Sequence, residues 1–158
     1  MAETITIRAG TTGDAAAVAA LGRAVIPATY AAISEAETAR TLDTWWTEKA
    51  LRESLGGLPH WVAEEPTGRI VGVANLGNRG DRTVMWKLYV HPDHQRTGLG
   101  QALLERVIEE AGDEPLWLSY VDGNTNAAGF YAAHGFVEQE HEPHPPYPDQ
   151  VWMRRDPR

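Results

Sequence analysis

The sequence contains no cysteine among its 158 residues. This absence excludes disulfide bonds, thiolate metal sites and a cysteine nucleophile. Lysine is also scarce, since Lys49 and Lys87 are the only two, and the net charge is -8. Proteins that bind nucleic-acid backbones need a basic surface, so the composition excludes nucleic acid as an expected partner.

Long apolar runs are missing as well. No stretch approaches the roughly 18 apolar residues that are needed to span a bilayer. The opening MAETITIRAG has neither the basic region nor the apolar region of a signal peptide. We therefore expect a cytoplasmic protein with no membrane partner. No linker, repeat or low-complexity tract interrupts the chain, which predicts a single domain over residues 1–158.

The hydrophobic pattern predicts elements in the order β-α-α-β-β-β-α-β-α-β-β. Two expected strands, 83–90 and 115–121, flank a helix, which indicates a right-handed parallel crossover. Alternation and apolar runs predict strands over 4–10, 60–65, 70–77, 83–90, 115–121, 136–142 and 150–156. Helical spacing predicts helices over 11–25, 35–57, 98–113 and 126–135. Pro27 is expected to interrupt the first of them just after residue 25.

The stretch HQRTGLGQALL, residues 94–104, places two glycines at the entrance of a predicted helix. The first N–H groups of a helix have no intrahelical partner and carry partial positive charge, so they suit an anionic phosphate. Gly98 and Gly100 remove side chains that would keep a pyrophosphate away, and Arg96 can add a charged hydrogen bond. The spacing matches neither a Walker A loop nor the Rossmann fingerprint. A tight turn without any ligand explains the glycines equally well at this point.

Two longer motifs resemble one known family. LYVHPDHQRTGLGQALL, residues 88–104, resembles the acetyl-CoA loop of the GCN5-related N-acetyltransferases (GNAT). NTNAAGFYAAHGF, residues 124–136, resembles the second signature of that family. The opening IRAGTTGDAAAVAAL is also similar to the start of the family, so the resemblance covers nearly the whole chain.

The resemblance implies an α+β fold with a mixed, mostly antiparallel central sheet flanked by helices. In this family two parallel strands splay apart, here those ending at Val90 and near Val121, and acetyl-CoA lies in the gap. The family also implies a homodimer. The pantetheine arm of the cofactor would pair with the backbone of Leu88, Tyr89 and Val90. Asn124 would either bind this arm or help to place the helix behind it. The pyrophosphate would bind the backbone amides of Gln95, Arg96, Thr97, Gly98, Leu99, Gly100 and Gln101.

The resemblance also implies residues for the chemistry. Tyr131 matches the family tyrosine that faces the cofactor sulfur and protonates the departing thiolate as a general acid. The alternative for Tyr131 is a tyrosine packed on a helix face. The amide of Leu88 would stabilise the carbonyl oxygen. Many members carry a glutamate where this chain has Val84 and Met85, so the base would be a water chain or another carboxylate such as Glu64.

The segments that would meet the acceptor carry both carboxylates and aromatic side chains. Such a combination suits a cationic amine, for example a polyamine, through charge pairing and cation–π contact. The alternative for these residues is that they belong to solvated polar loops. A protein or peptide could also be the acceptor. A non-catalytic acyl-CoA sensor is the alternative to an enzyme. The residues are Glu35, Glu37, Asp43, Glu138, Glu140, Glu142 and Asp149, with Tyr30, Trp45, Trp46 and Tyr147.

Histidine pairs three residues apart raise the question of a metal. His91 and His94 form one pair, and His141 and His144 form the other. A zinc site needs three or four ligands with supporting partners, so we expect no metal. The chain also lacks the GxSxG motif of serine hydrolases.

Overall fold

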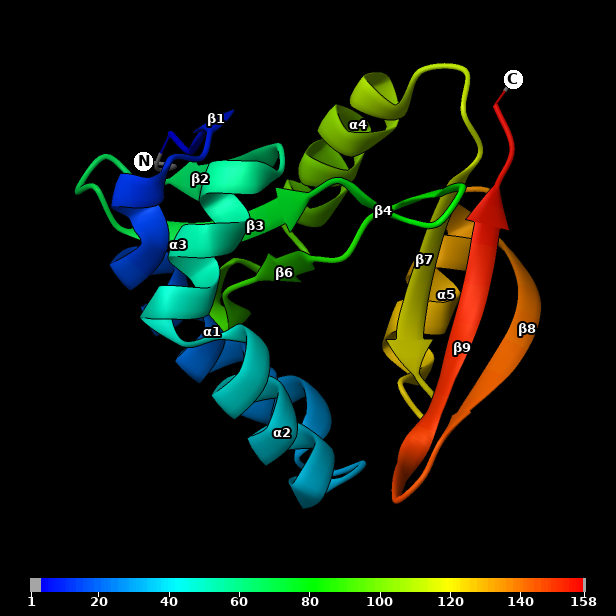
Figure 1. The fold of residues 1–158 in the computed structure, drawn as a ribbon. Coiled ribbons are helices and arrows are strands. Elements are labelled where there is room, and N and C mark those ends of the chain that lie inside the picture. The colour runs from blue at the N-terminus through cyan, green and yellow to red at the C-terminus, as the bar shows by residue number, and fades with distance from the viewer. Residues whose placement is uncertain (1–3, 158) are drawn as a thin grey trace.

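Two β-sheets meet at a splayed gap in the middle of the molecule (Figure 1). The computed structural model describes residues 4–157, so the predictions for residues 1–3 and 158 lie outside it. The strands are β1 Thr6–Ala9, β2 His60–Glu64, β3 Ile70–Asn75, β4 Gly77–Arg79, β5 Arg82–Val84, β6 Leu88–Val90, β7 Leu116–Val121, β8 Val137–His144 and β9 Tyr147–Arg155. The helices are α1 Ala15–Tyr30, α2 Glu35–Trp45, α3 Glu48–Gly57, α4 Leu99–Ala111 and α5 Thr125–Ala133, with 3-10 turns at Thr12–Asp14 and Pro92–His94.

The strand order defines the two sheets. The first sheet has the order β1-β2-β3-β6 and is antiparallel throughout. The second has the order β4-β5-β7-β9-β8, and only β5 and β7 run parallel. The predicted α+β class and the parallel pair around a helix are therefore confirmed.

The predicted strand 83–90 is broken into two shorter strands. Its first part, β5, pairs with β7, whereas its second part, β6, pairs with β3. Asn75 stabilises the break, because its Oδ1 accepts a hydrogen bond from the amide of Lys87 at 2.7 Å. The chain thus changes sheets within residues 85–87, and this change creates the splay.

Two predicted helix boundaries were wrong. Helix α1 continues through Pro27 to Tyr30, because its apolar face is buried against the sheet and outweighs the one backbone hydrogen bond that proline removes. The predicted helix 35–57 is two helices that meet at Trp46. The Trp46 ring packs so closely on Gly22 that a Cβ there would lie 2.3 Å from it. Thr47 then caps α3 by accepting from the amide of Ala50 at 3.1 Å.

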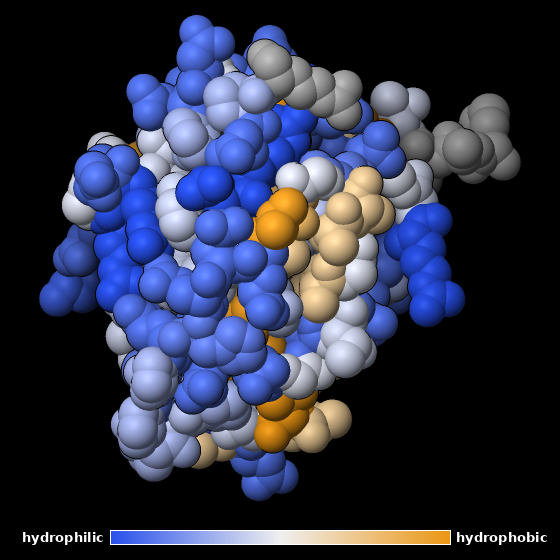
Figure 2. Space-filling model, turned by 90° about the vertical axis from the view of Figure 1, so that its right-hand side faces the viewer, coloured by the Kyte–Doolittle hydropathy of each residue, from blue (hydrophilic) through white to orange (hydrophobic). Residues whose placement is uncertain are grey.

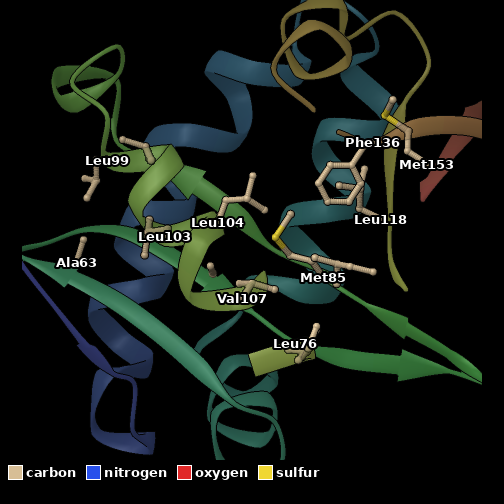
Figure 3. Packing of buried hydrophobic residues seen from close by; sticks show 14 of the residues in the cluster. Ala63, Leu76, Met85, Leu99, Leu103, Leu104, Val107, Leu118, Phe136 and Met153 are labelled. Atoms are coloured by element: carbon tan, nitrogen blue, oxygen red, sulfur yellow. The ribbon is translucent and has the colours of Figure 1, made fainter. Parts of the chain in front are cut away.

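Two hydrophobic clusters cover opposite faces of the sheets. One cluster joins α4 to β3, β7 and β9, and Figure 3 shows Leu103, Leu104 and Val107 of α4 among its members. The other joins α1 and α3 to β2 and β3 and contains Val73 of β3. Successive residues of a strand point to opposite faces, so the central strands belong to both clusters. The edges of β6 and β7 at the splay lie between these layers.

The C-terminal hairpin is longer than predicted. We expected strands 136–142 and 150–156 around a proline-rich loop, but the pairing of β8 and β9 extends to His144 and Tyr147. Cross-strand pairing thus continues into a segment whose prolines predict a loop. Among residues 4–157, no helix is both long enough and apolar enough to cross a membrane.

Candidate active site

A cleft of about 620 Å³ opens between β6 and β7. Its walls come from β6, β7, the second half of α1, the start of α4 and the helix α5. These elements lie around the gap between the two sheets in Figure 1. The cleft therefore joins segments that are far apart in the sequence.

The cleft exists because β7 loses its partner partway along its length. The ladder between β5 and β7 ends near the hydrogen bond from the amide of Met85 to the carbonyl of Trp117, at 2.9 Å. Beyond that point β6 pairs with β3 instead. One edge of β6 and the end of β7 consequently face each other without bonding, and such an edge can accept an extended chain as an added strand.

The backbone of β6 presents alternating residues to the cleft. The carbonyl of Lys87 and the amide of His91 both bond to β3, so alternation directs the N–H and C=O groups of Leu88 and Val90 toward the other edge. The backbone of Tyr89 points to β3, which corrects its predicted role in pairing with a cofactor. Tyr89 reaches the cleft with its side chain instead.

The loop before α4 is fixed by side chains of its own and of neighbouring segments. Arg69 Nη2 lies 2.7 Å from His91 Nε2, and His94 Nε2 lies 3.2 Å from Glu65 Oε2. Gln95 Nε2 donates to the carbonyl of Val90 at 3.1 Å. The histidines therefore tie the loop to the turn between β2 and β3. Among residues 4–157, no group of three or more His, Cys, Asp or Glu side chains could hold a metal ion.

Two residues at the entrance of α4 adopt the left-handed conformation. Arg96 has φ 64° and Gly98 has φ 88°. The first helical bond runs from the amide of Ala102 to the carbonyl of Gly98. The amides of Leu99, Gly100 and Gln101 thus have no intrahelical partner and can bind an anion.

Most of the predicted cofactor residues meet at the cleft. Thr97 and Leu99 do not contribute side chains to its lining: the hydroxyl of Thr97 donates to the carbonyl of His94, and Leu99 is buried in the α4 core. Their backbone amides keep their predicted roles as a hypothesis. The predicted residues that line the cleft are Leu88, Tyr89, Val90, Gln95, Arg96, Gly98, Gly100, Gln101, Asn124 and Tyr131.

Helix α5 brings Tyr131 to the cleft. Its ring makes edge contacts with Phe130 and Phe136, with centroids 5.4 and 5.6 Å apart. Burial raises the pKa of Tyr131, so the hydroxyl stays protonated at neutral pH. Asn124 caps this helix by accepting from the amide of Ala127 at 3.2 Å. Of the two roles predicted for Asn124, this contact supports helix placement.

A family model described as "Acetyltransferase (GNAT) domain" matches residues 56–138, which is more than half of the chain. The chain belongs to the GNAT family. The matched region contains β6, the loop before α4 and the helix α5. The cleft is thus formed largely within the segment that defines the family.

Two proteins of similar sequence support this assignment. The L-amino acid N-acyltransferase MnaT of Escherichia coli is 48% identical over 65 residues, 38% of this chain and 37% of MnaT. The [Ribosomal protein bS18]-alanine N-acetyltransferase of E. coli is 32% identical over 96 residues, 59% of this chain and 65% of that protein. Both matches thus span less than two thirds of the relatives' length.

The fold agrees with a solved GNAT structure. The PaiA N-acetyltransferase of Thermoplasma acidophilum, solved in complex with coenzyme A, superposes with a TM-score of 0.81 at 18% identity. The alignment covers 98% of this chain and 99% of that one. At this identity the likeness shows the fold alone.

Within this GNAT cleft, the lining is almost free of charge. In the part of the chain that the structure describes, Arg96 is the only charged residue that lines it. Glu64, one candidate for the base, lies elsewhere and accepts from Arg8 Nε at 2.7 Å. Lys87 turns away from the cleft to Ser54, 3.3 Å away, and burial lowers its pKa to about 8. Among residues 4–157, therefore, no carboxylate base lies in the cleft lining.

Several acceptor-side carboxylates already have protein partners. Glu142 pairs with Arg79 at 2.7 Å and Glu140 pairs with Arg82 at 2.6 Å. Glu37 is 2% exposed and is held by the guanidinium of Arg40 at 2.8 Å. The side of the molecule shown in Figure 2 is mostly hydrophilic, with a narrow band of hydrophobic residues. These ion pairs weaken the basis for a polycationic acceptor.

A pair of phenols at the cleft was missed by reasoning from the motifs. The hydroxyls of Tyr30 and Tyr89 are 2.9 Å apart, and both residues line the cleft. Tyr30 ends α1, whereas Tyr89 lies in β6. Because the two residues are 59 positions apart in sequence, no local motif contains the pair.

Proposed function

We propose that the chain is an acetyl-CoA-dependent N-acetyltransferase that acts on a primary amine of a small molecule. The observation that carries this proposal is the cleft itself. Its unpaired strand edge leads directly to a helix N-terminus opened by left-handed residues. An extended arm with a phosphate at one end fits such a site.

The residues of the cleft suit acetyl-CoA. The outward N–H and C=O groups of Leu88 and the N–H group of Val90 would pair with the amide-bearing pantetheine arm. The carbonyl of Val90 already accepts from Gln95 Nε2. The free amides at the start of α4 would bind the pyrophosphate, and Arg96 would add charge. Bound in this way, the cofactor would have its thioester end toward the phenols of the cleft.

The mechanism we propose is direct attack by the amine. Acetyl-CoA supplies the activated acetyl group as a thioester. The amine nitrogen forms a bond to the acetyl carbon while the carbon–sulfur bond breaks, and the amide of Leu88 stabilises negative charge on the carbonyl oxygen. Tyr131 gives its hydroxyl proton to the sulfur. The nitrogen releases one proton to water, and water returns a proton to Tyr131, so the reaction balances.

Arg96 offers a direct test of the phosphate contact. Arg96→Ala is expected to weaken coenzyme A binding about tenfold at low salt, because a charge-assisted hydrogen bond is lost. The difference from the wild type should shrink as salt screens the exposed charge. Calorimetric titration at two salt concentrations measures this, and Arg106→Ala, an exposed arginine of α4 outside the cleft, serves as the control. An equal loss in both variants would contradict the assignment.

The polyamine acceptor predicted from the sequence remains one candidate. Its support is the acidic and aromatic residues of the segments expected to meet the acceptor, including Glu35, Asp43 and Tyr147. The ion pairs of Glu37, Glu140 and Glu142 reduce the negative charge that is free to bind a polycation.

An amine that carries a carboxylate, such as an α-amino acid, is the second candidate. Arg40 lies over the ring of Tyr147, 5.0 Å from its centroid, and joins α2 to β9. Glu37 uses Nε and Nη2 of Arg40, which leaves Nη1 to donate to an acceptor carboxylate. The name of the relative MnaT, an L-amino acid N-acyltransferase, points the same way.

An acceptor panel tests the proposed function. Release of the coenzyme A thiol from acetyl-CoA would be followed with polyamines, L-amino acids and short peptides with free N-termini, and a reaction without acceptor would be the control. We expect acceptor-dependent release with a small amine. Release with peptides alone would support a protein substrate, as the name of the bS18-alanine N-acetyltransferase suggests. Tight acetyl-CoA binding with no release would support the sensor alternative.

Three further predictions from the sequence concern the protein as a whole. They are its single-domain organisation, its cytoplasmic location and its assembly as a homodimer. We retain them as proposals alongside the transferase activity, and the homodimer is an expectation from the family.

A further inference from the structure

The phenol pair of Tyr30 and Tyr89 links two layers of the fold at the cleft. The two hydroxyls are 2.9 Å apart, and the ring of Tyr89 packs edge-on against Trp46 with centroids 5.2 Å apart. Tyr30 is 7% exposed and belongs to the core cluster of α1 and α3. Both side chains are therefore held in fixed positions.

The pair lies on the opposite face of the sheets from the general acid. Tyr131 packs against the α4 cluster, whereas Tyr30 and Tyr89 pack with the α1 cluster. The phosphate-binding end of the cleft belongs to α4. A cofactor bound there leaves the α1 side of the thioester for the incoming amine. With the thioester held in this way, Tyr30 would lie on the side from which the amine approaches, and Tyr131 on the side toward which the sulfur departs.

The hydroxyls of the pair act as neutral groups. Burial raises the pKa of Tyr30 and of Tyr89, so neither is ionised at neutral pH. A phenol oxygen has lone pairs to spare after one hydrogen bond. Whichever tyrosine donates in the pair, the oxygen of Tyr30 can still accept from a second N–H group.

We propose that the hydroxyl of Tyr30 accepts a hydrogen bond from the attacking amine and orients it toward the acetyl carbon. This inference rests on the proposed transferase function. An N–H group bound to the oxygen of Tyr30 directs the nitrogen lone pair away from Tyr30 and across the splay toward the thioester. The phenol dipole also stabilises the positive charge that develops on the nitrogen as the new bond forms.

Tyr89 has a different role in the same pair. Its hydroxyl fixes the position of the Tyr30 hydroxyl, so Tyr89 is a positioning residue. This division of roles also accounts for a cleft lining without a carboxylate: the amine arrives neutral, a hydrogen bond aligns it, and its surplus proton leaves to water. Tyr30 is therefore a catalytic residue that the family motifs do not contain.

Two matched variants test the proposal. Tyr30→Phe and Tyr89→Phe both remove the hydrogen bond between the phenols, so both should change the melting temperature equally. Only Tyr30→Phe removes the contact with the amine. We expect kcat/KM for the acceptor to fall at least about tenfold further in Tyr30→Phe than in Tyr89→Phe, with the calorimetric Kd of acetyl-CoA unchanged in both. The dependence of kcat/KM on acceptor basicity should change in Tyr30→Phe alone.

The outcomes separate the inference from the proposed function. Equal losses of kcat/KM in the two variants, or no loss in Tyr30→Phe, would overturn the role of Tyr30 while leaving the transferase in place. A wild-type protein that binds acetyl-CoA but acetylates no amine in the panel would overturn both. A weaker acetyl-CoA affinity in Tyr30→Phe would assign the residue to the cofactor instead.

Discussion

Replacement of Tyr131 by phenylalanine is expected to lower kcat about 100-fold, because a general acid contributes a factor of this order. The ring contacts with Phe130 and Phe136 do not involve the hydroxyl, so the variant should fold normally. The Kd of acetyl-CoA should stay within a factor of about two, since the proton is needed only as the sulfur departs. Steady-state kinetics and calorimetry on the same preparation measure both quantities.

The pH dependence of turnover gives the matching control. Because burial raises the pKa of Tyr131, the acid stays protonated as the pH rises from 7 to 9. The wild-type rate should therefore rise with the fraction of neutral acceptor amine and show no fall from loss of the acid. Unchanged kcat in Tyr131→Phe would contradict its catalytic role, as would a loss of cofactor affinity that matches the loss of rate.

Gly98→Val is expected to weaken coenzyme A binding about 100-fold. Gly98 has φ 88°, and a left-handed conformation costs an L-residue about 1–2 kcal/mol. A Cβ at Gly98 would meet no protein atom within 4 Å, so the space beside it is open to a phosphate. Valine would both strain the loop and occupy that space, which removes a charge-assisted hydrogen bond as well. Calorimetric titration measures the affinity.

Two control variants separate strain from obstruction. Gly112 also has a positive φ, of 61°, at the far end of α4, so Gly112→Val should lower stability without changing coenzyme A affinity. Gly98→Asn introduces a Cβ with a residue that tolerates the left-handed region. We expect Gly98→Asn to weaken binding less than Gly98→Val. Normal affinity in Gly98→Val would rule out the phosphate site.

Local patterns predicted the type and order of most elements. They did not predict the element boundaries that depend on packing against distant segments. The run TVMWKLYV contains no glycine or proline that would mark a break. The break is instead held by the side chain of Asn75 in another strand. The helix break at Trp46 depends on Gly22 of α1, because the absence of a side chain there leaves room for the Trp46 ring. Pro27 remains inside a helix because α1 is buried on the sheet. Each outcome requires a partner distant in sequence.

The residues of the candidate site were likewise predicted where they lie in one contiguous motif and missed where the fold brings distant residues together. Residues 94–104 and 124–136 are contiguous, so the motifs located the helix entrance and Tyr131. Tyr30 and Tyr89 are 59 positions apart, and their contact exists only in the folded chain. The carboxylates suggested an acidic acceptor site, yet Glu37, Glu140 and Glu142 pair with arginines that composition alone does not position.

Titration of the protein with coenzyme A, followed by the NMR signals of its backbone amides, tests most directly whether the splay is the cofactor site. We expect shifts at Leu88 and Val90 on β6, at residues 96–101, and at the start of α5. The paired strands β1 and β2 should stay unchanged. Absence of any shift, or shifts confined to β1 and β2, would contradict the assignment of the cleft between β6 and β7.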